Sequence, residues 1–274
     1  MNFDSYQFFD QSRKLIGIKG NDAKKFLQGI LTNDIDSALD SIIYTGILTP
    51  QGKYLYDFFV WGINKETFVI DIEEERVEEL KNKLVMYRLR SDVIFFNIDK
   101  KVLIGLGKKP VSSFLDPRNP KLGWRKLVGL EFEDKNIDTL DNVKIEYEQL
   151  RIELGIPKYG CELIPYESFI LEVGFNRLNG ISFSKGCFVG QEVTARMKHK
   201  ATLKNGLIRF RNAPDCLFGK KKIINEKGQT VGFLSSSING IGLGLIKFLY
   251  AKGRLICDGN ELKVLDEINS SLRI

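Results

Sequence analysis

The residues with the clearest chemical potential lie in one stretch, residues 182–200, which reads SFSKGCFVGQEVTARMKHK. Cys187 follows Lys185 closely, and a nearby cation favours the thiolate, the form that attacks electrophiles and binds metals. Gly186 and Gly190 allow a positive φ, and a helix that starts after Gly190 would favour the thiolate further. The stretch therefore indicates a reactive thiol, a single metal ligand, or a small apolar residue in a turn.

Three polar residues after the cysteine belong to the same candidate site. Gln191 and Glu192 would place an amide and a carboxylate at a helix start, and Glu192 would face Arg196 one turn later. Lys185 and Arg196 would keep the Cys187 thiol ionised. The same residues also suit a capped helix with one surface ion pair, which would stabilise the fold by only about half a kcal/mol.

The single histidine of the chain raises an alternative chemistry. His199 lies twelve residues after Cys187, so the two could form a Cys–His nucleophilic pair. Such a hydrolase would also need an acid that orients the imidazole and an oxyanion hole. No motif of that kind is present, and we regard this alternative as the weaker one.

The spacing of the four cysteines predicts no resident metal site. Cys161, Cys187, Cys216 and Cys257 are too far apart in sequence for the close pairs that zinc and iron–sulfur motifs use. All but Cys187 are expected in the core or in strands. If the protein takes part in iron–sulfur chemistry, it supplies one thiolate and shares a transient cluster with another protein.

Strand and helix patterns alternate through the N-terminal part of the chain. A helix is predicted directly after Gly20-Asn21-Asp22, a stretch that offers an N-cap. Further helices are predicted over residues 73–89 and 142–156. Gln51-Gly52 joins two aromatic-rich strands into a hairpin. Strands are predicted over residues 14–19, 42–50, 53–62, 67–72, 92–98 and 101–107.

Residues 108–126 are rich in turn residues and separate this block from the C-terminal half of the chain. Beyond about residue 203, short strands alternate with glycine-bearing turns, a pattern typical of a small antiparallel barrel. These strands are predicted over residues 207–210, 221–224, 230–236, 240–248 and 261–265. We therefore predict an α+β fold, with mixed sheets and helices in a domain of residues 1–200 and an antiparallel β-barrel in a domain of residues 201–274.

The composition is that of a globular protein of 274 residues, with 43% apolar residues and a net charge of +6. The basic excess is compatible with a weak contact to RNA or with an anionic cofactor. Early acids and the lack of an apolar run at the N-terminus argue against a signal or transit peptide. Apolar stretches are shorter than a membrane span requires. A cytoplasmic location without a membrane partner is therefore expected.

The string from Lys185 to Glu192, KGCFVGQE, followed by Arg196, resembles the K-G-C-[FY]-x-G-Q-E-x(3)-R signature of the YgfZ family. These are folate-binding proteins of iron–sulfur cluster maturation, related to the aminomethyltransferase (T-protein) of the glycine cleavage system, and the similarity extends to a mitochondrial branch that acts late in [4Fe–4S] assembly. The resemblance covers nearly the whole chain and weakens in the C-terminal barrel. Blocks that match in the same order are FLQGILTND (26–34), LTPQGKYLYDF (48–58), LRIELGIPKYG (150–160), IPYE (164–167) and NGISFSKGC (179–187).

This resemblance implies that the domains surround a central channel for tetrahydrofolate or a one-carbon derivative, with the cysteine beside it. Glu167 matches the carboxylate that contacts the pterin ring in aminomethyltransferases, and a carboxylate can accept two N–H bonds from an aminopyrimidine edge. A glutamate on the protein surface shortly after a proline would give the same sequence pattern, so Glu167 also fits that simpler role. Asn33, Asp34 and Tyr159 would line the same cavity, although a turn or helix cap explains Asn33 and Asp34 as readily.

One departure from the transferase pattern concerns the hairpin. Aminomethyltransferases carry paired aspartates there, whereas this chain has Tyr56-Asp57, so only Asp57 remains for the folate site. Glycine-cleavage chemistry is therefore not expected, and whether the protein turns over any substrate stays open. Because the transferase branch lacks the KGCFVGQE cysteine, the active group has moved from a carboxylate to the thiol of Cys187.

Together these features predict a tetrahydrofolate-binding accessory factor in the assembly or repair of iron–sulfur clusters. Its expected partners are the assembly machinery and client [4Fe–4S] enzymes, and its working residue is Cys187. One alternative is a folate-dependent one-carbon transferase, which would depend on Glu167 or Asp57 instead. Another is a basic protein associated with tRNA modification, which would bind RNA in a salt-dependent manner.

Overall fold

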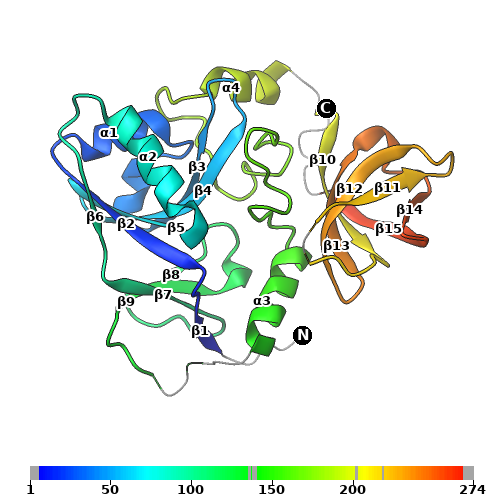
Figure 1. The fold of residues 1–274 in the computed structure, drawn as a ribbon, viewed down its shortest axis with the longest axis horizontal. Coiled ribbons are helices and arrows are strands. Elements are labelled where there is room, and N and C mark those ends of the chain that lie inside the picture. The colour runs from blue at the N-terminus through cyan, green and yellow to red at the C-terminus, as the bar shows by residue number, and fades with distance from the viewer. Residues whose placement is uncertain (1–5, 135–136, 138–140, 201–202, 218, 268–274) are drawn as a thin grey trace. The chain divides into compact units, whose positions relative to one another are not determined.

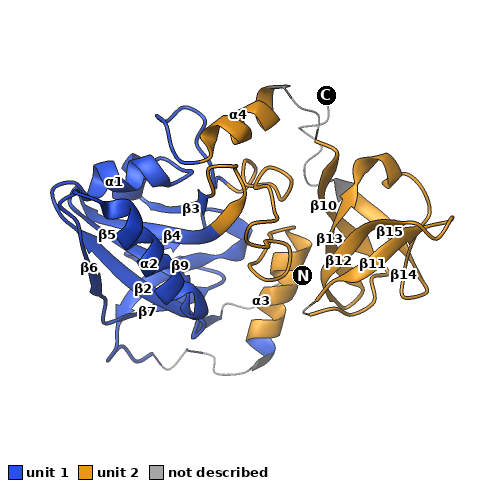
Figure 2. Cartoon of the chain, turned by 45° about the horizontal axis from the view of Figure 1, so that its top comes forward, with its two compact units in different colours: residues 1–48, 56–143, 179–189 blue, residues 49–55, 144–178, 190–274 orange. Residues whose placement is uncertain are grey.

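The computed structural model describes residues 6–134, 137, 141–200, 203–217 and 219–267 (Figure 1). The chain forms two compact units, and each is assembled from segments that are distant in sequence (Figure 2). The first unit contains residues 1–48, 56–143 and 179–189, and the second contains residues 49–55, 144–178 and 190–274. The predicted domain boundary after residue 200 adjoins residues 201–202, which lie outside the described residues, and that division stays a prediction.

A five-stranded sheet forms the centre of the first unit, in the order β3-β4-β5-β2-β6. Strands β3 and β5, and β4 over most of its length, are buried without alternation, because both faces of the sheet are covered. The predicted strands of this block are confirmed. Their bounds are β2 (Arg13–Lys19), β3 (Ile42–Leu48), β4 (Tyr54–Asn64), β5 (Thr67–Glu73) and β6 (Ile94–Asn97).

Two helices belong to this unit, α1 (Ala23–Ile30) and α2 (Val77–Arg88). The start of α1 after Gly20-Asn21-Asp22 is confirmed, and Asp22 occupies the N-cap position, although its side chain makes no capping hydrogen bond. Its carboxylate instead accepts the backbone N–H of Asp92 at 2.8 Å, which ties the start of α1 to the loop after α2. The buried residues of α1 recur at helical spacing and are Ala23, Phe26, Leu27 and Ile30.

A second, four-stranded sheet of this unit has the order β1-β7-β9-β8. It consists of β1 (Gln7–Phe9), β7 (Lys100–Gly105), β8 (Phe114–Leu115) and β9 (Trp124–Gly129). Residues 108–126, which were predicted as a turn-rich segment, also hold β8 and the start of β9. Three prolines and Gly123 favour turns in that segment, whereas β9 forms by pairing with β7 along its whole length. The rings of Trp61 and Phe114 pack 5.9 Å apart between the two sheets.

The second unit holds most of α3 (Asp141–Glu153), helix α4 (Gln191–Lys200) and a closed six-stranded barrel. The barrel order is β10-β13-β12-β11-β14-β15, so the predicted α+β class with a C-terminal antiparallel barrel is confirmed. Among these barrel strands only β14 was not predicted, because a strand of three residues is too short to show an alternating or apolar pattern. The barrel strands are β10 (Asn205–Arg211), β11 (Lys221–Asn225), β12 (Thr230–Ile238), β13 (Ile241–Lys247), β14 (Leu255–Cys257) and β15 (Asn260–Glu267).

A buried ion pair joins the parts of this second unit. Arg151 of α3 pairs with Glu162 at 3.2 Å and donates to the hydroxyl of Ser236 in β12 at 3.0 Å. Ser236 in turn donates to Glu162 at 2.6 Å. These bonds hold the segment after α3, which carries Tyr159 and Glu167, against the barrel. No helix in the described part of the chain has the length and apolar composition of a membrane span.

Candidate functional site

The cysteine loop, residues 182–189, is bound at both ends to the segment where α1 terminates. The backbone N–H of Ser182 donates to the carbonyl oxygen of Thr32 at 3.0 Å. The backbone N–H of Val189 donates to the carbonyl oxygen of Gly29 at 3.3 Å. Since these two bonds span the loop, its middle is presented at a defined place beside α1.

Lys185 fastens the loop between these ends. Its buried ammonium donates to the carbonyl oxygens of Gln28 (2.8 Å), Leu31 (2.6 Å) and Asn33 (2.9 Å). A helix ends with carbonyls that lack intrahelical partners, and an ammonium has three N–H groups to donate. Burial lowers the pKa of Lys185 to about 8, although Asp34 acts in the opposite direction. Lys185 thus positions the loop, a role that adds to the one predicted for it beside the thiol.

Cys187 is exposed at the middle of this loop and carries a free thiol. Gly190 at the end of the stretch adopts φ 83°, as predicted, whereas Gly186 has no positive φ. The thiol borders an open pocket of about 530 Å³ over one side of α1. The residues that line this pocket are Asn21, Lys24, Lys25, Gln28, Gly29 and Cys187.

The cations of this pocket were missed by the sequence analysis. Lys24 forms an ion pair with Asp36 and remains partly exposed, and Lys25 is exposed. Both come from α1, and both precede the FLQGILTND block by only a few residues. The available signal was the adjacent pair Lys24-Lys25 at the start of an amphipathic helix. Its relation to Cys187 depends on a long-range contact that no local pattern reveals.

The other predicted partners of the thiol lie on α4. This helix begins at Gln191, as predicted, but in its described side chains no ion pair joins Glu192 to Arg196, and both are exposed. The expected surface ion pair is therefore not formed. Cys187 belongs to the first unit, whereas α4 with His199 belongs to the second. The roles of Gln191, Glu192 and Arg196, and the Cys–His alternative, stay predictions.

Asn33 and Asp34 form the turn after α1. The Asn33 amide donates to the carbonyl oxygens of Tyr44 (2.9 Å) and Asn179 (2.7 Å). The Asp34 carboxylate accepts the backbone N–H of Asp36 at 3.1 Å and so caps a short 3₁₀ helix. These are the turn and cap contacts that the sequence also allowed. A contact of either residue with folate stays a prediction.

Asp57 lies on β4 and is only 6% exposed. Its carboxylate accepts the hydroxyl of Tyr44 at 2.8 Å, and burial together with this carboxylate raises the pKa of Tyr44. Asp57 therefore belongs to the interior of the first unit. The same unit holds a connected network of buried and half-buried charged residues: Arg13, Asp71, Glu73, Asp116, Arg118 and Arg125.

Asp71 is the centre of this charged network. It is fully buried and pairs with Arg13 at 2.7 Å and with Arg125 at 3.0 Å. Burial alone would raise the pKa of Asp71, but the two guanidinium groups outweigh it and hold that pKa below its usual range. The Arg125 guanidinium also lies over the ring of Phe59, 4.0 Å from its centroid. The network therefore locks the four-stranded sheet onto the five-stranded sheet.

Glu167 and Tyr159 lie in the second unit. The Glu167 side chain is 67% exposed, and its ion pair with Lys220 is a long one of 3.4 Å. The preceding residue, Tyr166, has φ 64° and is 63% exposed. Tyr159 is half-buried and its backbone bridges to Leu163. An exposed carboxylate that can accept N–H bonds, next in sequence to an exposed aromatic ring, suits a flat heterocycle with N–H groups.

The exposure of the four thiols predicts a selective labelling pattern. Iodoacetamide is expected to modify native protein at neutral pH at one site, Cys187, because the other three thiols are buried. Burial also raises the pKa of Cys161, of Cys216 and, with Asp258, of Cys257, the last to about 11. Intact mass followed by peptide mapping measures the pattern, with urea-unfolded protein as the fully labelled control. Labelling of a second cysteine at a similar rate would contradict this description.

The chain resembles proteins of known role. It is 31% identical over 235 residues to the mitochondrial iron–sulfur cluster assembly factor IBA57 homolog of Neurospora crassa, covering 76% of this chain and 52% of that protein. It is 26% identical over 280 residues to the human mitochondrial assembly factor IBA57, covering 89% of this chain and 78% of that protein. The match thus spans about half the length of the fungal relative. No family model matches the chain.

The fold has a solved counterpart in the glycine cleavage system aminomethyltransferase T from Bartonella henselae. The two structures superpose with a TM-score of 0.76 over 98% of this chain and 87% of the transferase, at 13% sequence identity. At that identity the likeness concerns the fold alone. The T-protein-like architecture that the motifs implied is therefore confirmed.

The relatives correct one prediction. Their names place the Neurospora, human and mouse proteins in mitochondria, which contradicts the expected cytoplasmic location. That expectation relied on the absence of a targeting pattern at the start of this sequence, which is weaker evidence than similarity across most of the chain. The chain is thus a homologue of iron–sulfur cluster assembly factors, built on the fold of a glycine-cleavage aminomethyltransferase.

Proposed function

We propose that the protein is an accessory factor in the assembly or repair of iron–sulfur clusters and that Cys187 is its working residue. The observation that carries the residue assignment is the exposed thiol on a loop anchored by Lys185, beside a pocket lined by lysines. The names of the relatives support the class of function. The KGCFVGQE string supports the finer assignment to the YgfZ type.

The chemistry of this role needs a partner. No group of three or more His, Cys, Asp or Glu residues in the described ranges could hold a metal ion. A cluster that meets Cys187 must therefore keep its other ligands on another protein, either the assembly machinery or a client [4Fe–4S] enzyme. The thiol would release its proton to solvent and donate a sulfur lone pair to iron, while Lys24 and Lys25 offset the negative charge.

Tetrahydrofolate, or a one-carbon derivative, is the proposed cofactor. These residues fit it, because the exposed Glu167 carboxylate can accept N–H bonds from the aminopyrimidine edge and the exposed Tyr166 ring offers a stacking surface. Bound folate would supply a one-carbon carrier or a reducing group. The transferase alternative is less well supported, since Asp57 is buried and hydrogen-bonded to Tyr44.

A rescue experiment tests the proposal. In cells that lack their endogenous homologue, the full chain is expected to restore the activity of a [4Fe–4S] enzyme. A cluster-free enzyme from the same compartment serves as the control and should not change. Failure to restore the [4Fe–4S] enzyme at matched protein level would contradict the proposal. Turnover of a folate substrate by the pure protein would favour the transferase instead.

A further inference from the structure

An exposed apolar surface lies where α2 runs alongside strand β6. One hydrogen bond joins Lys81 of α2 to the side chain of Asn97 in β6 (3.4 Å), and another joins Arg88 of α2 to the carbonyl oxygen of Val93, the residue before β6 (3.4 Å). Four large apolar side chains of this region are exposed by 51%, 68%, 85% and 52%. They are Val85, Met86, Leu89 and Ile94, and we name them the α2–β6 patch.

Leu89 is the most exposed member of this patch, and its backbone is strained. It terminates α2 with φ 48° and ψ −110°, a region that residues with a Cβ rarely adopt. Glycine or asparagine usually occupies such a position after a helix. Neither the helix end nor the core requires a leucine here, since its side chain is 85% exposed. A leucine held outward in this way indicates a binding surface.

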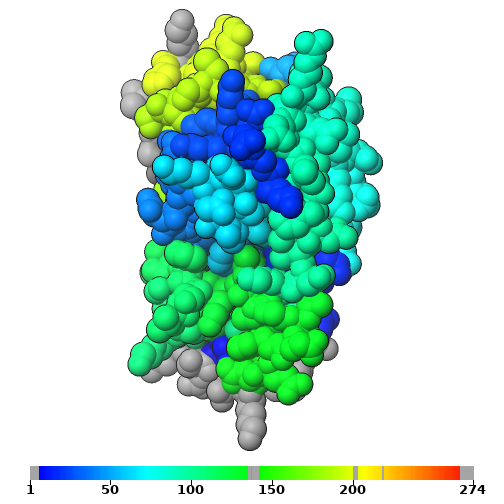
Figure 3. Space-filling model, turned by 90° about the vertical axis from the view of Figure 1, so that its left-hand side faces the viewer, coloured from blue at the N-terminus to red at the C-terminus, as the bar shows by residue number. Residues whose placement is uncertain are grey.

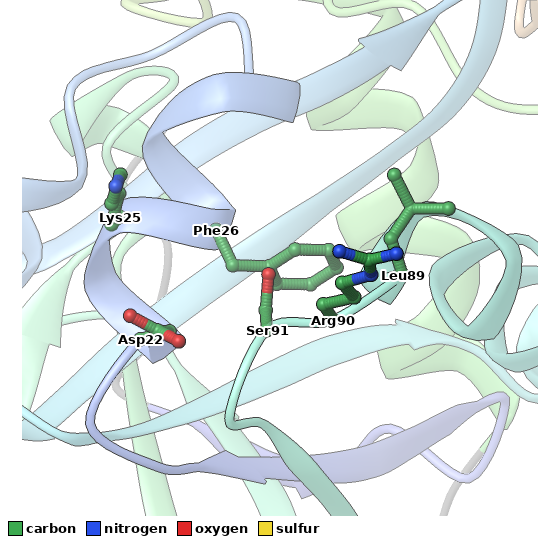
Figure 4. A pocket seen from close by; sticks show the side chains of 6 residues that line it. All are labelled: Asp22, Lys25, Phe26, Leu89, Arg90 and Ser91. Atoms are coloured by element: carbon green, nitrogen blue, oxygen red, sulfur yellow. The ribbon is translucent and has the colours of Figure 1, made fainter.

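A pocket of about 630 Å³ adjoins Leu89 (Figure 4). Phe26 reaches from α1 toward residues 89–91 and, being 7% exposed, forms an apolar floor. Lys25 and Arg90 also line the pocket and are exposed, whereas the Asp22 carboxylate is hydrogen-bonded to a backbone N–H. The surfaces of α1 and of the segment after α2 lie side by side on this face (Figure 3). The pocket thus combines an apolar floor with a rim that carries two cations, Lys25 and Arg90, and one carboxylate, Asp22.

We propose that the α2–β6 patch and this pocket dock an acidic segment of a partner protein. One apolar side chain of the segment inserts against Phe26 and Leu89, and its carboxylates face Lys25 and Arg90. Strand β6 is an edge of its sheet, so an extended segment can pair with its outer side. The patch has no aromatic member, and the pocket is lined by one aromatic ring, that of Phe26. Single-stranded RNA stacks successive bases on several aromatic rings, so this surface suits a protein better.

The location of Lys25 connects this surface to the thiol. Lys25 lines both this pocket and the pocket that contains Cys187. A segment docked here therefore lies alongside the cysteine loop. The partner that we assign to the α2–β6 patch and its pocket is the protein that shares a cluster with Cys187. This identification rests on the proposed function.

The docking is tested with the full chain and a short synthetic peptide that has one central leucine flanked by glutamates. The peptide is expected to bind saturably and to shift the amide resonances of residues 25, 89–91 and 94. The double variant Leu89→Asp/Arg90→Glu is expected to weaken binding by about tenfold or more. The matched control is Leu249→Asp, since Leu249 is also 85% exposed but lies in the second unit, and it should bind as wild type does.

Three results would overturn the docking proposal: no peptide binding, equal binding by the Leu89→Asp/Arg90→Glu variant, or equal binding of a peptide with lysines in place of glutamates. Displacement of the peptide by a single-stranded RNA oligonucleotide that itself binds more tightly would also overturn it. In the rescue experiment the double variant should fail while still folding and still labelling at Cys187. If wild type does not rescue but the double variant still binds the peptide more weakly than wild type does, the proposed function is wrong and the docking surface is still supported.

Discussion

Replacing Cys187 by serine is expected to lower the activity of a [4Fe–4S] enzyme in the rescue experiment by about tenfold or more, because a hydroxyl cannot replace a thiolate as an iron ligand. The change should leave the fold intact, since Cys187 is exposed and the loop is held by backbone bonds and Lys185. The measurement is enzyme activity at matched protein level. Full rescue by the serine variant would show that the Cys187 thiol is not required and that the cysteine loop is a structural turn.

The neighbouring residue provides a matched control for this variant. Gly186 is exposed, has no positive φ, and an added Cβ would meet no atom within 4 Å. Gly186→Ala is therefore expected to rescue as wild type does. Loss of rescue in both variants would show that the partner needs the shape of the loop, and the thiol would lose its special role.

The largest effect on stability is expected from Asp71→Asn. This change removes a carboxylate shared by two buried guanidinium groups, Arg13 and Arg125, and leaves each with one other acidic partner, Glu73 and Asp116 respectively. Breaking a buried ion pair costs roughly 3–5 kcal/mol of unfolding free energy. Both tryptophans of the chain, Trp61 and Trp124, are buried in the first unit, so their fluorescence during urea unfolding reports on the unit that contains Asp71.

The pH dependence of this variant follows from the lowered pKa of Asp71. A carboxyl with a depressed folded-state pKa stabilises the protein above its unfolded-state pKa of about 3.9, and the contribution is lost as pH falls through the folded-state value. The difference between wild type and Asp71→Asn should therefore be constant near neutral pH and shrink below about pH 4. The control Glu261→Gln breaks an exposed pair with Arg254 and should change stability by less than about 1 kcal/mol. An equal effect of the two variants would contradict the role of the buried network.

Local patterns predicted most of the elements that carry the site. The strands of the five-stranded sheet and the barrel follow from apolar runs bounded by turn residues, and α4 begins at Gln191 as its motif indicated. Strand β9 was missed because its neighbours Gly123 and Pro120 favour turns, while its pairing with β7 is a long-range event. Asp22 occupies the N-cap position of α1, but its side chain makes no capping bond because the carboxylate accepts a more distant backbone N–H, that of Asp92.

The sequence by itself determined the fold class, the motif that identifies Cys187, and the likeness to cluster-assembly proteins, because these depend on residue order and short-range periodicity. Only the tertiary structure decided what surrounds the thiol. Lys185 donates to carbonyls at the end of α1 across a separation of 157 residues, Lys24 and Lys25 line the thiol's pocket, and Asp57 is buried against Tyr44. Such contacts arise when distant segments pack together, and hydrogen-bond partners and burial are properties of that packing.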